Sequence, residues 1–171
     1  MIFVGGIHGV GKTYFCSELS RKLNIPHYSS SHLIAEQKKQ KFSSVKLESQ
    51  INKNQDYLFN ALKQLDNINF FILDGHFCLL NSKGNITKIS KGTFIKLSPK
   101  RIIVLIDKPE NISKKLFERD NKIYDPNLLK DFQNEELNHA KNIANILEID
   151  FDVIEMYGDI ENQLKRIGIL N

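Results

Sequence analysis

The residues best suited to chemistry lie near the start of the chain, in the stretch GGIHGVGKT at residues 5–13. The spacing matches G-x-x-x-x-G-K-[ST], and the stretch stands between an apolar run and a helical pattern, which is the context this motif needs. Glycines let successive backbone N–H groups turn toward phosphate oxygens, and the following helix adds the positive end of its dipole. The spacing therefore predicts a site for a nucleoside triphosphate.

Each position of this loop has an expected role. Lys12 places its charge on the β- and γ-phosphates, and Thr13 offers a hydroxyl to Mg²⁺. His8 occupies a variable position and faces either solvent or the γ-phosphate. No Asn-Lys-x-Asp pattern is present to read guanine, so we expect ATP. The positions expected to contact the nucleotide are Gly6, His8, Gly9, Val10, Gly11, Lys12, Thr13 and Tyr14.

A second acidic element follows another apolar run, in FFILDGHF at residues 70–77. Asp74 at the end of a strand holds Mg²⁺ directly or through water, or accepts the proton of an acceptor hydroxyl. His76 stands two residues later as a substrate contact or as a turn histidine. Asp107 also ends an apolar run, but the sequence IDKPEN predicts that it caps a helix.

Apolar, β-branched runs at 2–4, 70–73, 102–106 and 151–154 predict buried strands, and residues 24–30 give a weaker fifth. Helical patterns separate them; one apolar stripe runs from Leu47 to Leu65. Strands alternating with helices predict a doubly wound α/β domain with a parallel sheet, whose ligand lies at the carboxyl ends of the strands. Residues 77–90 predict a small hairpin with its turn at Gly84.

Composition restricts the function classes. The chain has 171 residues, which suits one domain over 1–171. A net charge of +4 fits an anionic ligand, a nucleotide or RNA, or a lysine-rich surface without such a role. Cys16 and Cys78 form no CxxC pair and are expected to be reduced core thiols. No apolar run predicts a membrane span or a signal peptide, so we expect a cytoplasmic protein.

These motifs together resemble the P-loop kinases, specifically the adenylate kinase-like nucleoside and nucleotide kinases. GGIHGVGKT, HYSSSHLI, LDGH and LFERDNKIYD stand in the order of that family. LDGH is similar to the Asp-x-His element of archaeal-type adenylate kinases and their ribosome-assembly relatives. The resemblance implies a five-stranded sheet in the order 2-3-1-4-5, acceptor-side helices at about 30–66 and a short lid at about 114–126. It also implies phosphate contacts from Arg119, and substrate contacts from Ser30, His76 and Lys122.

The chain departs from this family in its arginines, which are Arg21, Arg101, Arg119 and Arg166. The segment SSSHLIAEQKK has none where an acceptor phosphate would be gripped, and lysine lacks the bidentate fork. This favours an acceptor hydroxyl without a phosphate, or an RNA end.

The sequence therefore predicts an ATP- and Mg²⁺-dependent phosphotransferase with Lys12, Asp74 and Arg119 as catalytic residues, acting on a nucleoside, nucleotide or other small acceptor. Two alternatives stay open. One is an ATPase switch or assembly factor acting on RNA or protein, and the other is an RNA 5′-end kinase. The oligomeric state stays open as well.

Overall fold

The computed structural model of the chain describes residues 1–40, 50–65, 70–81, 83–121 and 123–170. The strands are β1 (Ile2–Gly5), β2 (His27–Ser29), β3 (Ile72–Asp74), β4 (Cys78–Leu80), β5 (Ile86–Lys88), β6 (Arg101–Ile106) and β7 (Asp150–Glu155). The helices are α1 (Lys12–Leu23), α2 (Ser30–Gln40), α3 (Gln50–Lys63), α4 (Lys91–Leu97), α5 (Pro109–Asp120), α6 (Pro126–Leu147) and α7 (Ile160–Arg166).

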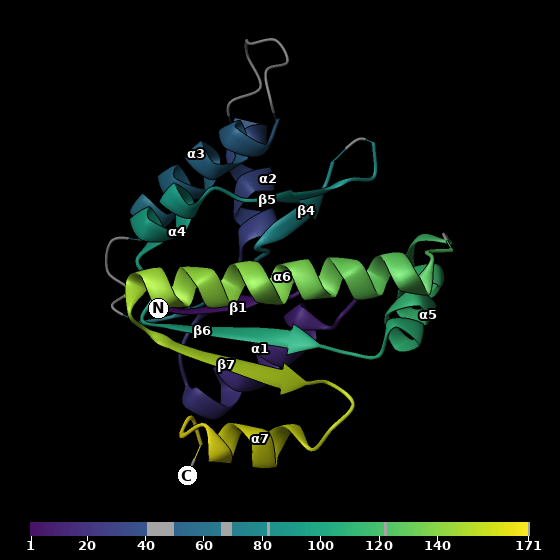
Figure 1. Cartoon of the computed structure of the whole chain (residues 1–171). Coiled ribbons are helices and arrows are strands. Elements are labelled where there is room, and N and C mark those ends of the chain that lie inside the picture. The colour runs from purple at the N-terminus through teal and green to yellow at the C-terminus, as the bar shows by residue number, and fades with distance from the viewer. Residues whose placement is uncertain (41–49, 66–69, 82, 122, 171) are drawn as a thin grey trace.

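Five strands of the described chain form a parallel sheet in the order β2-β3-β1-β6-β7. Numbered along the chain without the hairpin strands, this is the predicted order 2-3-1-4-5. Strands β1, β6 and β7 of the sheet are labelled in Figure 1. The doubly wound α/β fold is confirmed. β4 and β5 form a separate antiparallel pair, which confirms the predicted hairpin insertion, and Gly84 in its turn has a positive φ of 78°.

The apolar strands are buried because helices cover both faces of the sheet. On β6, Ile103 and Leu105 pack into one core with residues of α1, α5 and α7. Ile102 and Val104 point to the other face and pack with residues of α3 and α4. Side chains alternate between the faces of a strand, so a strand covered on both sides carries a continuous apolar run.

Parallel pairing brings the predicted site residues to one edge of the sheet. Val4 of β1 and Ser29 of β2 are both in register with Asp74 of β3. The loop that follows β1, the turn that follows β2 and the carboxylate at the end of β3 therefore meet at the carboxyl edge of the sheet. α2, α3, α4 and the hairpin gather on one side of the sheet in Figure 1.

Some boundaries differ from the sequence predictions. β3 begins at Ile72, because the strand pairs with β1 and β2 only from Ile72 to Asp74. Phe70 of the predicted run precedes the strand and is 44% exposed. The predicted lid at 114–126 is mostly helix, since α5 continues to Asp120 and ends at Asn121 in the left-handed region. α4 was not predicted; its signal is Ser90, whose hydroxyl caps the helix by accepting from the Gly92 N–H.

Leu47 of the predicted stripe lies outside the described residues, and α3 begins after it at Gln50. Across the described chain, none of the helices combines the length and the apolar character needed to cross a membrane.

Candidate active site

The phosphate loop depends on backbone conformations that favour glycine. Gly6, Gly9 and Gly11 have φ values of 142°, 81° and 109°. Gly11 is the residue before α1, where it makes no side-chain cap, and the first turn of α1 carries no acidic residue. No side chain of the described residues caps this helix end, so its first N–H groups can bind an anion.

Lys12 is buried at the base of the loop. Its Nζ donates to the carbonyl oxygens of Gly6 and Ile7, at 2.6 and 3.1 Å. Burial lowers the pKa of Lys12 to about 8, although the Glu136 and Asp74 carboxylates oppose that shift. Lys12 lines the cavity where the sequence predicts a ligand, and its ammonium group also donates to the carbonyls of its own loop.

The neighbouring loop positions divide into exposed and buried side chains. Thr13 and Tyr14 are exposed and line the cavity above the loop. Val10 is fully buried in the core, so only its backbone can face a nucleotide. Thr13 therefore keeps its hydroxyl available at the place where the motif predicts a metal contact.

Asp74 is held by its neighbours on β2 and α2. His27 Nε2 lies 2.8 Å from Asp74 Oδ2, and the Ser30 hydroxyl donates to the Asp74 carbonyl oxygen at 2.6 Å. Ser30 was predicted to contact the acceptor. It does line the cavity, but its hydroxyl proton is already used to hold the turn after β3.

His8 and His76 form a ring pair beside the loop, with centroids 4.1 Å apart. Desolvation, together with the Lys12 charge, lowers the pKa of His8 to about 4 and the pKa of His76 well below its usual value. Both rings are therefore neutral at neutral pH. His76 Nδ1 is buried and has no hydrogen-bond partner among the described residues, so it can accept or donate one bond to a ligand.

Arg119 lines the same cavity from the last turn of α5. Its guanidinium is exposed and binds both carboxylate oxygens of Asp120, at 2.7 and 2.5 Å. Lys122, which the resemblance predicts as a substrate contact, lies outside the described residues.

The cavity has a volume of about 580 Å³ and extends from the phosphate loop to the side formed by α2, α3 and α4. That far side is largely apolar, with Asn54, Gln55, Thr93 and Lys38 as its polar lining. Asn54 Oδ1 is buried and has no hydrogen-bond partner in the described chain. The apolar lining side chains there include Ile34, Leu58, Leu79, Ile89, Phe94 and Leu97.

A family model described as AAA domain matches residues 5–131, from the phosphate loop into α6. The chain belongs to this family. The match includes the phosphate loop, Asp74 and Arg119 of the AAA-domain chain. No curated protein sequence matches it.

Solved structures share the fold of this AAA-domain chain. A gluconokinase from Sinorhizobium meliloti 1021 has a TM-score of 0.56 and 12% identity, over 96% of this chain and 86% of that one. A shikimate kinase from Bacteroides thetaiotaomicron has a TM-score of 0.53 and 18% identity, over 97% and 94%. An uncharacterized protein from Eubacterium ventriosum ATCC 27560 has a TM-score of 0.51 and 16% identity, over 97% and 94%. The expected fold of the P-loop kinases is confirmed.

Within the matched residues, the sequence predictions gave Lys115 no site role. Its Nζ lies 2.7 Å from Asp107 Oδ2 and 3.5 Å from the carbonyl oxygen of Val10, and it lines the cavity. Burial alone would raise the pKa of Asp107, but hydrogen bonds from Lys115 and Asn111 hold it below its ordinary value. Asp107 supports the start of α5 as predicted, although the capping position itself is Lys108.

A second missed residue, Glu136 on α6, lies beyond the residues that the AAA-domain model matches. Its carboxylate is fully buried and accepts hydrogen bonds from the backbone N–H groups of Gly6, Phe77 and Cys78, at 2.6 to 3.0 Å. Burial raises the pKa of Glu136, and the hydrogen bonds from these three N–H groups oppose the rise, as does the charge of Lys12. Glu136 therefore ties the phosphate loop to the segment after Asp74.

The sequence did contain a signal for Glu136. It stands four residues from both Phe132 and Ala140, so it lies on the apolar face of α6. A carboxylate on a buried helix face needs hydrogen-bond donors, and that requirement points to a structural or functional role.

Proposed function

We propose that this chain is an ATP- and Mg²⁺-dependent phosphotransferase that passes the γ-phosphoryl group to a hydroxyl of a small acceptor. The observation that carries the proposal is one continuous cavity, which joins a phosphate loop at one end to a largely apolar chamber at the other. Such a cavity can place a triphosphate and an acceptor in line. Two of the solved structures that share the fold, a gluconokinase and a shikimate kinase, are kinases by name, and this also supports the proposal.

The residues at the nucleotide end fit Mg²⁺. Mg²⁺ prefers oxygen ligands, and the cavity presents the Thr13 hydroxyl and the Asp74 carboxylate. His27 binds one oxygen of that carboxylate, which leaves the other for the metal or for the proton of the acceptor hydroxyl. Bound Mg²⁺ would neutralise charge on the phosphates.

Lys12 and Arg119 supply the cationic groups for the transferring phosphoryl group. Lys12 would exchange the loop carbonyls for phosphate oxygens, and the loss of those two bonds is offset by charge-assisted ones. Arg119 would leave an exposed ion pair with Asp120, which costs little because such pairs contribute about 0–1 kcal/mol.

The acceptor chamber favours an uncharged molecule with an apolar body. Lys38 is the cation that lines this part of the cavity in the described chain, and its ammonium group cannot bind a phosphate in the bidentate manner of an arginine. Asn54 Oδ1 and His76 Nδ1 are buried polar atoms that have no hydrogen-bond partner within the described ranges, so they suit a ligand that carries hydrogen-bonding groups. A nucleoside fits this description better than a nucleoside monophosphate.

The test is transfer of γ-labelled phosphate from Mg·ATP to a panel of nucleosides, nucleoside monophosphates, gluconate, shikimate and 5′-hydroxyl RNA. Lys12→Ala is the control, and circular dichroism checks that it folds. A labelled small acceptor that needs both Mg²⁺ and Lys12 supports the proposal. Label released only as free phosphate would favour an ATPase switch, and label only on RNA would favour an end kinase.

A further inference from the structure

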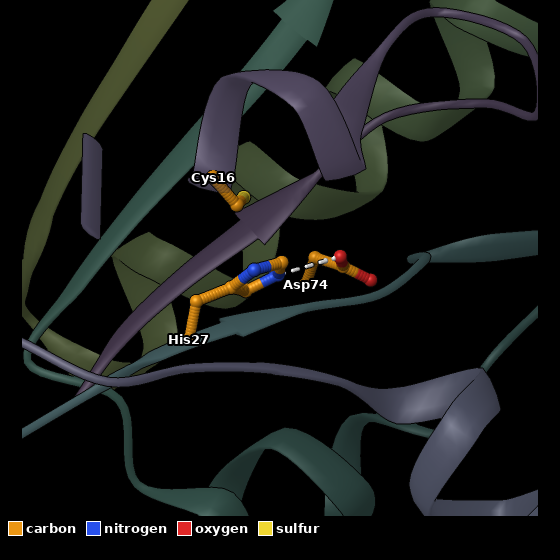
Figure 2. Close-up of side chains that lie close together, drawn as sticks. All are labelled: Cys16, His27 and Asp74. Carbon is orange, nitrogen blue, oxygen red and sulfur yellow. Dashed lines mark hydrogen bonds and ion pairs between the residues drawn. The ribbon is translucent and has the colours of Figure 1, made fainter. Parts of the chain in front are cut away.

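Three side chains that offer metal-binding atoms converge beside the phosphate loop, from three different elements. They are Cys16 of α1, His27 of β2 and Asp74 of β3, and their ligand atoms lie within 4.8 Å of one another (Figure 2). Cys16 is fully buried, and the His27 and Asp74 side chains are 11% and 6% exposed. The cluster is therefore shielded from bulk solvent.

We propose that Cys16, His27 and Asp74 bind a thiophilic divalent cation of the zinc class, and that the charge of this cation on one oxygen of Asp74 opposes binding of Mg²⁺ to the other oxygen. Thiolate, imidazole and carboxylate together suit zinc, whereas Mg²⁺ prefers oxygen ligands alone. Cys16 is thus the residue that would make the site select zinc over Mg²⁺. Binding of the cation is independent of the proposed function, and only its effect on phosphoryl transfer rests on that function.

The charges balance when such a cation binds. The Cys16 thiol loses its proton to solvent, His27 binds as the neutral ring with its hydrogen on Nδ1, and Asp74 is ionised. One thiolate and one carboxylate then neutralise the two positive charges, which burial requires. Burial raises the pKa of the Cys16 thiol, so the cation must displace this proton and binds more tightly as the pH rises.

The three ligand atoms lie within 4.8 Å of one another, and tetrahedral bonds place a thiolate sulfur about 3.6 Å from a nitrogen or oxygen ligand, so Cys16 Sγ moves closer to the other two by up to about 1 Å when a cation binds. His27 Nε2 and Asp74 Oδ2 are 2.8 Å apart, and tetrahedral bonds of about 2.0–2.1 Å place two ligand atoms about 3.3 Å apart. Rotation of the two side chains can supply this difference. Three protein ligands leave a fourth tetrahedral position for water, and Asp74 lines the cavity through which the ion would arrive.

The first test uses Co²⁺ as a spectroscopic probe on the metal-free full chain. We expect a thiolate-to-Co²⁺ charge-transfer band in the near ultraviolet and release of about one proton per bound ion. The chain has two cysteines, both buried and free, so Cys78→Ala is the matched control for Cys16→Ala. The band should persist in Cys78→Ala and disappear in Cys16→Ala.

Absence of the band in the unmodified chain overturns the site, and so does a band that Cys16→Ala retains. Circular dichroism and thermal melting establish that the variants fold, and Cys16→Ser replaces Cys16→Ala if the alanine leaves the chain unfolded. His27→Gln should weaken Co²⁺ binding at least tenfold.

The second test measures phosphoryl transfer with saturating Mg·ATP while Zn²⁺ is added. We expect Zn²⁺ to inhibit the unmodified chain and Cys78→Ala at concentrations at least tenfold lower than those that inhibit Cys16→Ala. A cobalt band without zinc inhibition overturns the proposed effect on Mg²⁺ binding at Asp74. A cobalt band in a chain that transfers no phosphate to any acceptor overturns the proposed function and leaves the metal site intact.

Discussion

At the scale of single residues, Lys12 is subject to two opposing influences. Burial lowers its pKa to about 8, and the phosphates of a nucleotide would raise it again. The nucleotide-free loop compensates through hydrogen bonds from Lys12 to the Gly6 and Ile7 carbonyls. Protonation of this one group therefore links pH to nucleotide binding.

We predict that the affinity for Mg·ATP falls as the pH rises above about 8. In the folded chain without nucleotide the pKa of Lys12 is about 8, below its ordinary value of 10.5. This form therefore loses the charge of Lys12 at a lower pH than the nucleotide-bound form does. The bound phosphates keep Lys12 protonated, so binding above that pH takes up a proton and weakens by about tenfold per pH unit. Titration calorimetry between pH 7 and 9.5 measures this, and Lys12→Met should show no such slope. An unchanged affinity across that range would contradict the assignment.

Deprotonation of Lys12 should also make the free energy of unfolding of the nucleotide-free chain depend on pH. Lys12 is more easily deprotonated in the folded chain than in the unfolded one, so its contribution to the free energy of unfolding rises as the pH increases from about 8 toward 10.5. Comparison with Lys12→Met isolates this contribution from those of other groups.

Glu136 gives a second prediction at this scale. Glu136→Gln would turn an amide donor toward backbone donors at Gly6, Phe77 or Cys78, so we expect a loss of about 2–4 kcal/mol in the free energy of unfolding. The neighbouring Glu135 pairs with Lys88 at the surface. Glu135→Gln is therefore the control and should cost under about 1 kcal/mol. Equal effects in urea unfolding would show that Glu136 has no special role.

At the scale of elements, the phosphate loop packs against α5. A Cβ at Gly9 would lie 2.7 Å from Leu116 Cγ and 3.2 Å from Ile112 Cγ2, both on α5. The loop can therefore adopt its conformation only where no side chain separates it from this helix. The same helix carries Lys115 and Arg119, so this contact also positions the cations around the phosphates.

Gly9→Ala and Gly84→Ala form a matched pair, because their φ values are 81° and 78° but nothing lies within 4 Å of a Cβ at Gly84. We expect Gly84→Ala to cost about 1–2 kcal/mol of stability for the backbone conformation alone. Gly9→Ala should cost a further 1–3 kcal/mol or so for overpacking and should weaken nucleotide binding. If both variants unfold at the same denaturant concentration, the close packing of the loop on α5 is wrong.

At the scale of the whole molecule, one cavity at the carboxyl edge of the sheet is lined by elements from distant parts of the chain. The phosphate loop and α5 line one end, and α2, α3 and α4 line the other. A ligand that binds in this cavity contacts the folded chain and has no comparable site in the unfolded one. Ligand binding should therefore stabilise the entire fold.

We expect Mg·ATP at one hundred times its dissociation constant to add about 2.7 kcal/mol to the free energy of unfolding. For a domain of this size the midpoint of thermal unfolding should rise by roughly 5–10 °C. Differential scanning calorimetry measures the shift. Lys12→Ala at the same Mg·ATP concentration should shift far less, and an equal shift in that variant would place the nucleotide elsewhere.

Local patterns were enough to predict the phosphate loop, the α/β fold and the carboxylate at the end of β3. Each is encoded over a few residues, by glycine conformations, by apolar runs of strand length and by the helix that follows. The strand order was predicted from the resemblance to the P-loop kinases, and the phosphate-loop motif is the most specific feature of that resemblance. Lys12, Thr13 and Asp74 accordingly lie around one cavity.

The tertiary structure alone decided which distant groups support that loop. Glu136 reaches Gly6 across 130 residues, and His27 reaches Asp74 across 47. It also showed that the Ser30 hydroxyl is used on the Asp74 carbonyl and that Arg119 pairs with Asp120. Such contacts depend on which strands become neighbours and on which helix face is covered. Those outcomes come from packing of the whole chain, and no local pattern encodes them.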